Sequence, residues 1–122
     1  MSESIMFNYK AQNPLEKRKA ECESIMKSWP DRIPIILEKD PRSQLESIQK
    51  FKFLCPYDYT VQKFLTSIRL KVNLPKDVAL FLFVNGIDLM TGDSTMKEIY
   101  ERKKDEDGFI YLNYSDHPVL GG

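Results

Sequence analysis

Hydrophobic residues recur at helical spacing in three stretches of the chain and as continuous or alternating runs in four others. The first helical stretch, residues 14–29, places four apolar side chains on one face, namely Leu15, Cys22, Met26 and Trp29. Asn13 is a suitable N-cap for this helix, Pro14 suits its first position and Pro30 ends it. A short amphipathic segment at residues 6–10 precedes the helix, and its pattern predicts neither a helix nor a strand.

The clearest helical pattern lies at residues 60–72. Thr60 is suited to cap this helix, and its apolar positions follow the spacing i, i+3, i+4, i+7 and i+11, which gives Val61, Phe64, Leu65, Ile68 and Val72. A shorter helix is predicted at residues 95–103, with Thr95 and Glu98 as a capping box.

Four runs rich in β-branched and aromatic residues predict strands at residues 32–38, 50–55, 80–84 and 108–114. The first run is too apolar to have a solvent face, and Pro34 should lie near its start or beside a bulge. The second alternates lysine with phenylalanine, as expected of an edge strand with one solvated face. The third ends at the turn dipeptide Asn85-Gly86, after which residues 87–94 are predicted to be loop. After Trp29 the order is therefore ββαβαβ, an α+β domain with a four-stranded sheet.

Two charged segments are predicted to be solvated. One is the polar face of the first helix, formed by Lys17, Arg18, Lys19, Glu21 and Glu23, and the other is the connection at residues 103–107. The chain has eighteen basic and eighteen acidic residues. Residues 1–71 carry thirteen basic against nine acidic, and residues 72–122 carry five against nine. This asymmetry favours an acidic partner but is too slight for a dedicated nucleic-acid binder.

A chain of 122 residues is one domain, and its two cysteines constrain its chemistry. Cys22 and Cys55 lie far apart without a CxxC spacing, which favours buried thiols in a reduced, intracellular protein over a disulfide or a metal site. No signal peptide is visible, and no segment approaches the roughly 20 apolar residues needed to span a bilayer.

The sequence predicts no catalytic site, cofactor or metal site. His117, the single histidine, lies in the C-terminal tail, where it lacks the fixed geometry that general-base catalysis needs. Cys55 has no activating partner in the sequence, and no Gly-rich phosphate loop is present. An RNA-binding alternative rests on the basic and aromatic alternation at residues 50–53, but the order βαββαβ of an RRM differs from the order here.

The last predicted strand runs into a tail that ends in Gly121-Gly122. Glycine has no Cβ, so a glycine carboxylate can enter a narrow site. The hypothesis is that the tail is a substrate for other enzymes. The alternative is a disordered end or a cloning remnant.

Several segments together resemble the autophagy-related protein eight family of ubiquitin-like modifiers, which includes the GABA type A receptor-associated protein and the microtubule-associated protein light chain modifiers. The resemblance extends from Phe7 to Gly121 and rests on the order and spacing of residues 14–21, 30–36, 52–56, 60–64, 80–85 and 107–111. It implies a ubiquitin-like β-grasp fold with the last strand parallel to the first at the sheet centre. The implied divisions are an N-terminal helical extension (1–29), a β-grasp domain (30–114) and a flexible tail (115–122).

The resemblance also implies two pockets for aromatic-x-x-aliphatic peptide motifs of autophagy receptors. The aromatic pocket would be lined by Glu21, Ile25, Pro34, Lys52, Leu54 and Phe109. The aliphatic pocket would be lined by Phe53, Cys55, Pro56, Tyr59, Phe64, Ser67 and Ile68. For Phe64 and Ile68 the helical spacing alone already predicts a place in the core.

By the same resemblance, a cysteine protease cleaves between Gly121 and Gly122. E1-like and E2-like enzymes then conjugate Gly121 to phosphatidylethanolamine on the autophagosome membrane, and tubulin is a further candidate partner. A ubiquitin-style alternative makes Gly122 the reactive residue. The resemblance implies a cytoplasmic protein that moves to the autophagosome membrane after lipidation. The rival function is an adaptor that is not conjugated and uses the same groove in vesicle trafficking or microtubule attachment. Departures from the family pattern, such as Leu120 in place of an aromatic residue, bear on protease fit and motif preference.

Overall fold

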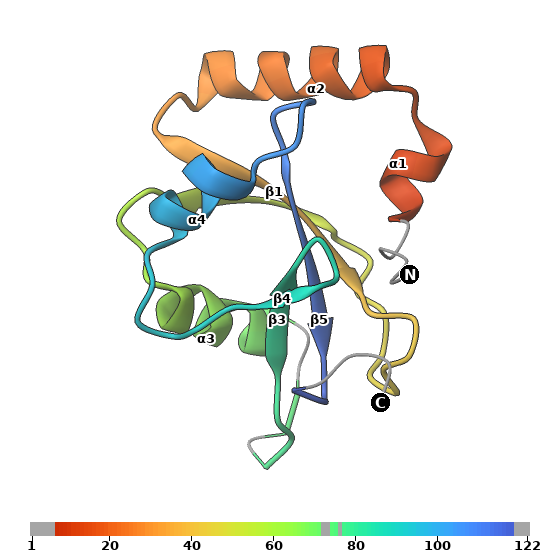
Figure 1. Cartoon of the computed structure of the whole chain (residues 1–122), viewed down its shortest axis with the longest axis vertical. Coiled ribbons are helices and arrows are strands. Elements are labelled where there is room, and N and C mark those ends of the chain that lie inside the picture. Colours follow the sequence, from red (N-terminus) through yellow and green to blue (C-terminus); the bar gives the residue numbers. More distant parts are fainter. Residues whose placement is uncertain (1–6, 72–73, 76, 119–122) are drawn as a thin grey trace.

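The computed structural model describes residues 7–71, 74–75 and 77–118, which form a mixed sheet covered by helices on both faces (Figure 1). Met6, Val72, Leu120, Gly121 and Gly122 lie outside the described residues. In chain order the elements are α1 (Asn8–Gln12), α2 (Leu15–Ser28), β1 (Arg32–Lys39), β2 (Lys52–Pro56), α3 (Val61–Lys71), β3 (Phe81–Val84), β4 (Asp88–Leu89), α4 (Met96–Lys103) and β5 (Ile110–Ser115).

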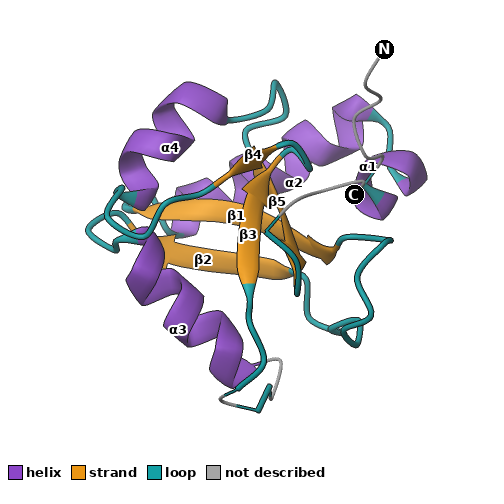
Figure 2. Ribbon diagram, turned by 60° about the horizontal axis from the view of Figure 1, so that its bottom comes forward, coloured by secondary structure: helices purple, strands orange, loops and turns teal. Residues whose placement is uncertain are grey.

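The sheet has the strand order β2-β1-β5-β3-β4, with β5 parallel to β1 and every other pair antiparallel (Figure 2). The last strand therefore lies parallel to the first at the sheet centre, and β2 is an edge strand, as predicted. These features confirm the ubiquitin-like α+β fold.

The four-stranded prediction was wrong, because β4 lies in the segment predicted to be loop. Asn85 and Gly86 both have positive φ values, 55° and 73°, which turn the chain back on itself. Asp88 and Leu89 then pair with Val84 and Phe83. A two-residue strand is too short to show an alternating pattern, so the turn dipeptide was its only signal.

Pro34 lies inside β1, opposite Leu54 of β2. The backbone N–H of Leu37 donates to Phe51, so along β1 the odd-numbered residues point their N–H groups toward β2. The nitrogen of Pro34 faces the other way, and β5 pairs with β1 only from Ile35 onward. The strand therefore tolerates a residue without an N–H at this position.

Two hydrophobic clusters lie on the two faces of the sheet. The larger one packs α3 and α4 against the sheet through side chains that include Phe64, Ile68 and Met96. The smaller one is rich in aromatic residues and joins α1 and α2 to the opposite face through Phe7, Tyr9, Cys22, Ile36, Phe109 and Tyr111.

The predicted threonine caps of α3 and α4 are both confirmed. The Thr60 hydroxyl accepts from the N–H of Lys63 at 3.1 Å, and the Thr95 hydroxyl accepts from that of Glu98 at 3.2 Å. Asn13 does not cap α2. Pro14 is the N-cap residue, and the Asn13 amide instead donates to the carbonyl of Tyr9 at 2.9 Å, where it closes α1.

Trp29 is also not on the buried face of α2, as its spacing had suggested. The helix ends at Ser28, and Trp29 leaves helical geometry with φ −134°. The residue is 48% exposed, and the guanidinium of Arg32 lies 5.6 Å from the centroid of its ring. Within the described ranges, no helix combines the length and apolar character needed to cross a membrane.

Candidate functional site

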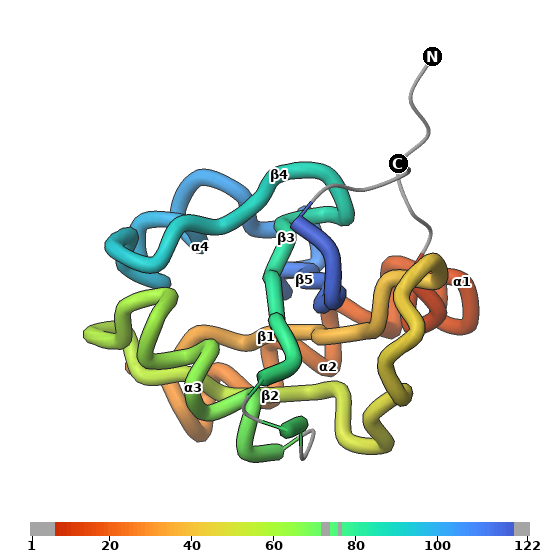
Figure 3. The backbone as a smooth tube through the Cα atoms, turned by 90° about the horizontal axis from the view of Figure 1, so that it is seen from below, coloured from red at the N-terminus to blue at the C-terminus, as the bar shows by residue number. Residues whose placement is uncertain are grey.

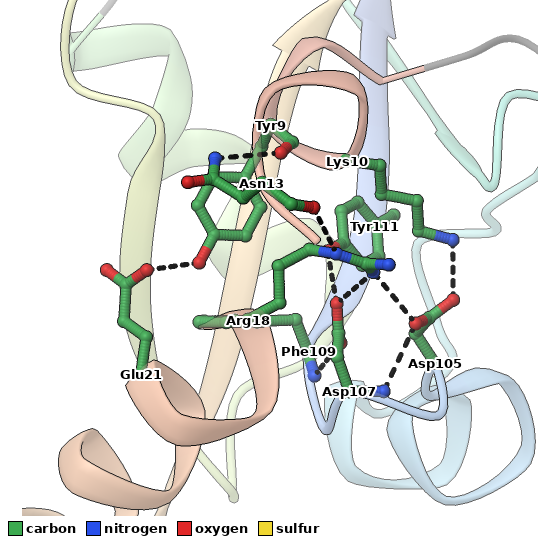
Figure 4. Close-up of polar contacts among 9 residues, drawn as sticks. All are labelled: Tyr9, Lys10, Asn13, Arg18, Glu21, Asp105, Asp107, Phe109 and Tyr111. Atoms are coloured by element: carbon green, nitrogen blue, oxygen red, sulfur yellow. Dashed lines mark hydrogen bonds and ion pairs between the residues drawn. The ribbon is translucent and has the colours of Figure 1, made fainter. Parts of the chain in front are cut away.

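Asp107 is the centre of a buried polar cluster between α2 and the start of β5 (Figure 4). Arg18 donates to its carboxylate at 2.7 Å, the Tyr111 hydroxyl donates to it at 2.5 Å, and the backbone N–H of Phe109 does so at 2.8 Å. Burial, followed by the hydrogen bond to Asp107, raises the pKa of Tyr111 above its ordinary value. The prediction of a solvated segment is confirmed for Lys103, Lys104 and Glu106, which are exposed. It was wrong for Asp107 and for Arg18, because these partners, 89 positions apart in the sequence, pair in the fold.

Asp105 extends this cluster to α1. The Lys10 ammonium lies 2.5 Å from its carboxylate, and Arg18 lies 3.5 Å away. Burial would raise the pKa of Asp105, but the contact with Lys10 and its other bonds outweigh burial and hold the pKa below its usual value. The ion pairs thus fasten both N-terminal helices to the loop that precedes β5.

Gly108 lets this loop approach α2 closely. Its φ of +99° is a conformation that other residues rarely adopt, and a Cβ at this position would lie 2.7 Å from the sulfur of Cys22. The close approach delivers Phe109 to the space between α2 and the sheet.

A groove of about 520 Å³ opens there, between α2 and the edge strand β2. Five of the six residues predicted for the aromatic pocket line it, namely Ile25, Pro34, Lys52, Leu54 and Phe109. The groove is also lined by Ser24, Ser28, Trp29, Lys50, Phe53 and Lys71, which the sequence did not predict for this pocket. The sequence carried no signal for this additional set, because the helical spacing had placed Trp29 on the apolar face of α2.

The sixth predicted residue, Glu21, holds Lys52 rather than lining the groove. Its carboxylate accepts hydrogen bonds from the Lys52 ammonium and the Tyr9 hydroxyl. Burial would raise the pKa of Glu21, but these two hydrogen bonds together keep it below its usual value. Three lysines (Lys50, Lys52 and Lys71) give the groove a basic lining suited to an acidic, extended ligand.

The residues predicted for the aliphatic pocket lie on β2, on α3 and, for Tyr59, in the connection between them. Phe53, Cys55, Phe64 and Ile68 are buried in the larger core, whereas Pro56, Tyr59 and Ser67 are partly exposed. The core positions of Phe64 and Ile68 agree with their helical spacing. These residues adjoin the groove through Phe53, which lines both the core and the groove.

Both cysteines are buried free thiols, as predicted. Burial raises the pKa of Cys22 to about 11 and that of Cys55 to about 12. At neutral pH both remain protonated and are poor nucleophiles. In the described part of the chain, no group of three or more His, Cys, Asp or Glu residues is placed to hold a metal ion.

The end of β5 is fixed by the loop between β1 and β2. The hydroxyl of Tyr114 donates to the carbonyl of Glu46 at 2.5 Å and accepts from the N–H of Ile48 at 3.1 Å. Ser43 donates to Asp116 at 2.8 Å, one residue beyond the strand. The chain therefore leaves the sheet from an anchored point beside this loop, which Figure 3 shows on the same side of the molecule as α1.

Comparison with known proteins agrees with this architecture. The family model described as "Autophagy protein Atg8 ubiquitin like" matches residues 17–121. The chain belongs to the Atg8 family. It is 44% identical over 113 residues to Autophagy-related protein 8e of Arabidopsis thaliana, covering 93% of this chain and 92% of that protein. It is also 44% identical over 114 residues to Autophagy-related protein 8 of Colletotrichum lindemuthianum, covering 93% of each.

The crystal structure of Trypanosoma brucei ATG8 is similar over 96% of this chain and 100% of that one, with a TM-score of 0.89 and 35% identity. This Atg8-family chain is thus an autophagy ubiquitin-like protein, and its partners belong to the autophagy machinery.

Proposed function

We propose that this chain is a covalent membrane tag, conjugated through Gly121 to phosphatidylethanolamine on autophagosomal membranes. Membership of the Atg8 family carries the proposal. The anchored end of β5 supports it, because Ser43 and Asp116 fix the point from which the tail leaves the sheet. A protease would remove Gly122, and E1-like and E2-like enzymes would activate and transfer Gly121. Two acyl chains give stable anchoring where one would be marginal.

Membrane recruitment in cells that contain the conjugation enzymes tests the proposed role of the tail. The variant Gly121→Ala with Gly122 deleted should stay in the cytoplasm, whereas deletion of Gly122 alone should leave membrane recruitment intact. Membrane recruitment of the Gly121→Ala variant would support the rival, an adaptor that is not conjugated.

We further infer that the groove binds short acidic peptides with an aromatic-x-x-aliphatic motif. An extended peptide can add to the open edge of β2, with main-chain hydrogen bonds for affinity and side-chain pockets for specificity. Burial of one large side chain contributes about 1.5–3 kcal/mol. With two anchors and the strand bonds, a Kd on the order of micromolar is expected.

Calorimetric titration of an acidic Trp-x-x-Leu peptide tests the groove. Lys52→Ala with Leu54→Ala should weaken binding at least about tenfold, the loss of about 1.4 kcal/mol. The matched control is Lys103→Ala with Leu89→Ala, which removes a lysine and an exposed leucine at the opposite edge of the sheet. Equal affinities for wild type and the Lys52–Leu54 double variant would contradict the site.

In this proposal the chain is a substrate and a recognition surface, without catalytic activity of its own. The raised thiol pKa values of Cys22 and Cys55 support this reading, since neither sulfur is poised as a nucleophile.

A further inference from the structure

Tyr9 lies behind the groove and does not line it. It contacts three of the residues that were predicted for the aromatic pocket, namely Glu21, Lys52 and Phe109. Its ring meets that of Phe109 edge to face, with centroids 5.6 Å apart and planes at 82°. Its hydroxyl donates to Glu21, and the Lys52 ammonium lies 5.0 Å from its ring centroid. Figure 4 shows the Tyr9 side chain directed at Glu21. Only 4% of Tyr9 is exposed, so a peptide in the groove would not touch it.

Glu21 transmits the position of Tyr9 to the groove. One carboxylate oxygen accepts from the Tyr9 hydroxyl and the other from the Lys52 ammonium. Because Lys52 is a long, half-exposed side chain, it keeps several rotamers unless partners fix it. Here the Glu21 carboxylate and the Tyr9 ring hold the ammonium at the groove.

Tyr9 is itself held by contacts that involve the sheet. The backbone N–H groups of Asn8 and Tyr9, at the start of α1, donate to the Glu38 carboxylate of β1 at 2.8 and 3.0 Å. Lys10, the next residue, pairs with Asp105. The position of α1 against the sheet therefore determines where the Tyr9 ring lies.

We propose that Tyr9 is a positioning residue for the groove, fixing Glu21, Lys52 and Phe109 in the arrangement that a peptide meets. The inference rests on the proposed peptide binding and deepens it. By thermodynamic reciprocity, a peptide that favours this arrangement also stabilises α1 against the sheet.

The variant Tyr9→Phe tests the hydroxyl alone, because it keeps the ring against Phe109. With an acidic Phe-x-x-Leu peptide, calorimetry should give a Kd about three to ten times that of the wild type, as expected for one hydrogen bond. Tyr9→Leu, which also removes the aromatic contacts, should weaken binding further. Thr95→Ala is the control, because it removes a helix cap on α4, on the other face of the sheet, and should leave the Kd unchanged.

A double-mutant cycle separates positioning from general destabilisation. In a Glu21→Ala background the link between Tyr9 and Lys52 is gone, so Tyr9→Phe should cause no further loss of affinity. Additive losses would overturn the proposal. If the wild type binds and Tyr9→Phe binds equally well, the positioning role fails while the groove stands. If the wild type binds no such peptide, both fail.

Hydrogen exchange tests the reverse effect, that of the peptide on α1. If Tyr9 had only a structural role, peptide binding would not change the amide exchange rates of α1. Saturating peptide should slow amide exchange at Asn8 and Tyr9 in the wild type, and less so in Tyr9→Phe. Trp29, the single tryptophan of the chain, lines the same groove and reports saturation by fluorescence when the peptide contains no tryptophan. Equal protection with and without peptide would contradict the coupling.

Discussion

The two ends of β5 are anchored by different chemistry. Before the strand begins, the buried carboxylate of Asp107 is paired with Arg18, and Asp105 is paired with Lys10. Where the strand ends, the anchors are the neutral hydroxyls of Tyr114 and Ser43. The first end holds charges from α1 and α2, whereas the second holds a loop between two strands.

The two kinds of anchor serve different parts of the molecule, the groove at the start of β5 and the tail at its end. At the start, ion pairs bring the N-terminal helices onto the sheet and place Phe109 in the groove. At the end, short hydroxyl contacts fix the base of the tail without tying it to either helix. Disruption of the start should therefore affect stability and peptide binding together, while disruption of the end should leave the groove intact.

The largest effect is expected from Asp107→Ala. Removing this carboxylate leaves the Arg18 guanidinium, which is 11% exposed, without its closest partner. Breaking a buried pair in this way costs about 3–5 kcal/mol of unfolding free energy. Urea denaturation measures the loss, and Glu106→Ala, an exposed neighbour, is the control. A loss below about 1 kcal/mol, the range of surface pairs, would show that the cluster is only peripheral.

Gly108→Ala should come next, at about 2–4 kcal/mol, because it adds the cost of a left-handed residue to a clash with Cys22. The matched control is Gly92→Ala, whose new Cβ would lie 3.2 Å from the end of the flexible Gln62 side chain and at an ordinary contact distance of 3.6 Å from its Cβ. Thermal denaturation compares the two. Similar melting temperatures for both variants would contradict the close approach of β5 to α2.

Tyr114→Phe tests the other end of the strand. It removes a hydroxyl that bonds two backbone groups of the loop, so the expected loss is about 1–2 kcal/mol. Peptide affinity should stay at the wild-type value, in contrast to Asp107→Ala. A parallel loss of affinity would show that the two ends are coupled.

The smallest effect is a pH dependence of the contacts made by the N-terminal helices. The folded-state pKa values of Glu21 and Asp105 lie below the ordinary 4.5 and 3.8, so the unfolded chain binds more protons in acid. Their contribution is complete at neutral pH and is lost as the pH falls below about 4.5. Lys10→Met should therefore be less stable than the wild type at pH 7 and closer to it at pH 3. A constant difference between these pH values would contradict the Lys10–Asp105 contribution.

Periodicity in the sequence predicted most of the strands and helices and the edge position of β2. The central pairing of β5 with β1 followed from the family resemblance. The sequence missed β4, whose two residues carry no period. It also missed the burial of Asp107, because ion pairing over such distances leaves no local pattern. Five of the residues that line the groove followed from the family resemblance. Trp29, Lys50 and Lys71 could not be predicted, because they come from three separate segments, the end of α2, the chain before β2 and the end of α3, which meet only in the folded structure.

The central claim, that β5 presents a processed tail, is tested most directly by the intact mass of the full chain after incubation with the cognate protease. Cleavage after Gly121 would remove one glycine residue from the mass and leave Gly121 as the last residue. An unchanged mass under conditions in which the protease cleaves a related substrate would contradict it and would favour Gly122 as the reactive residue.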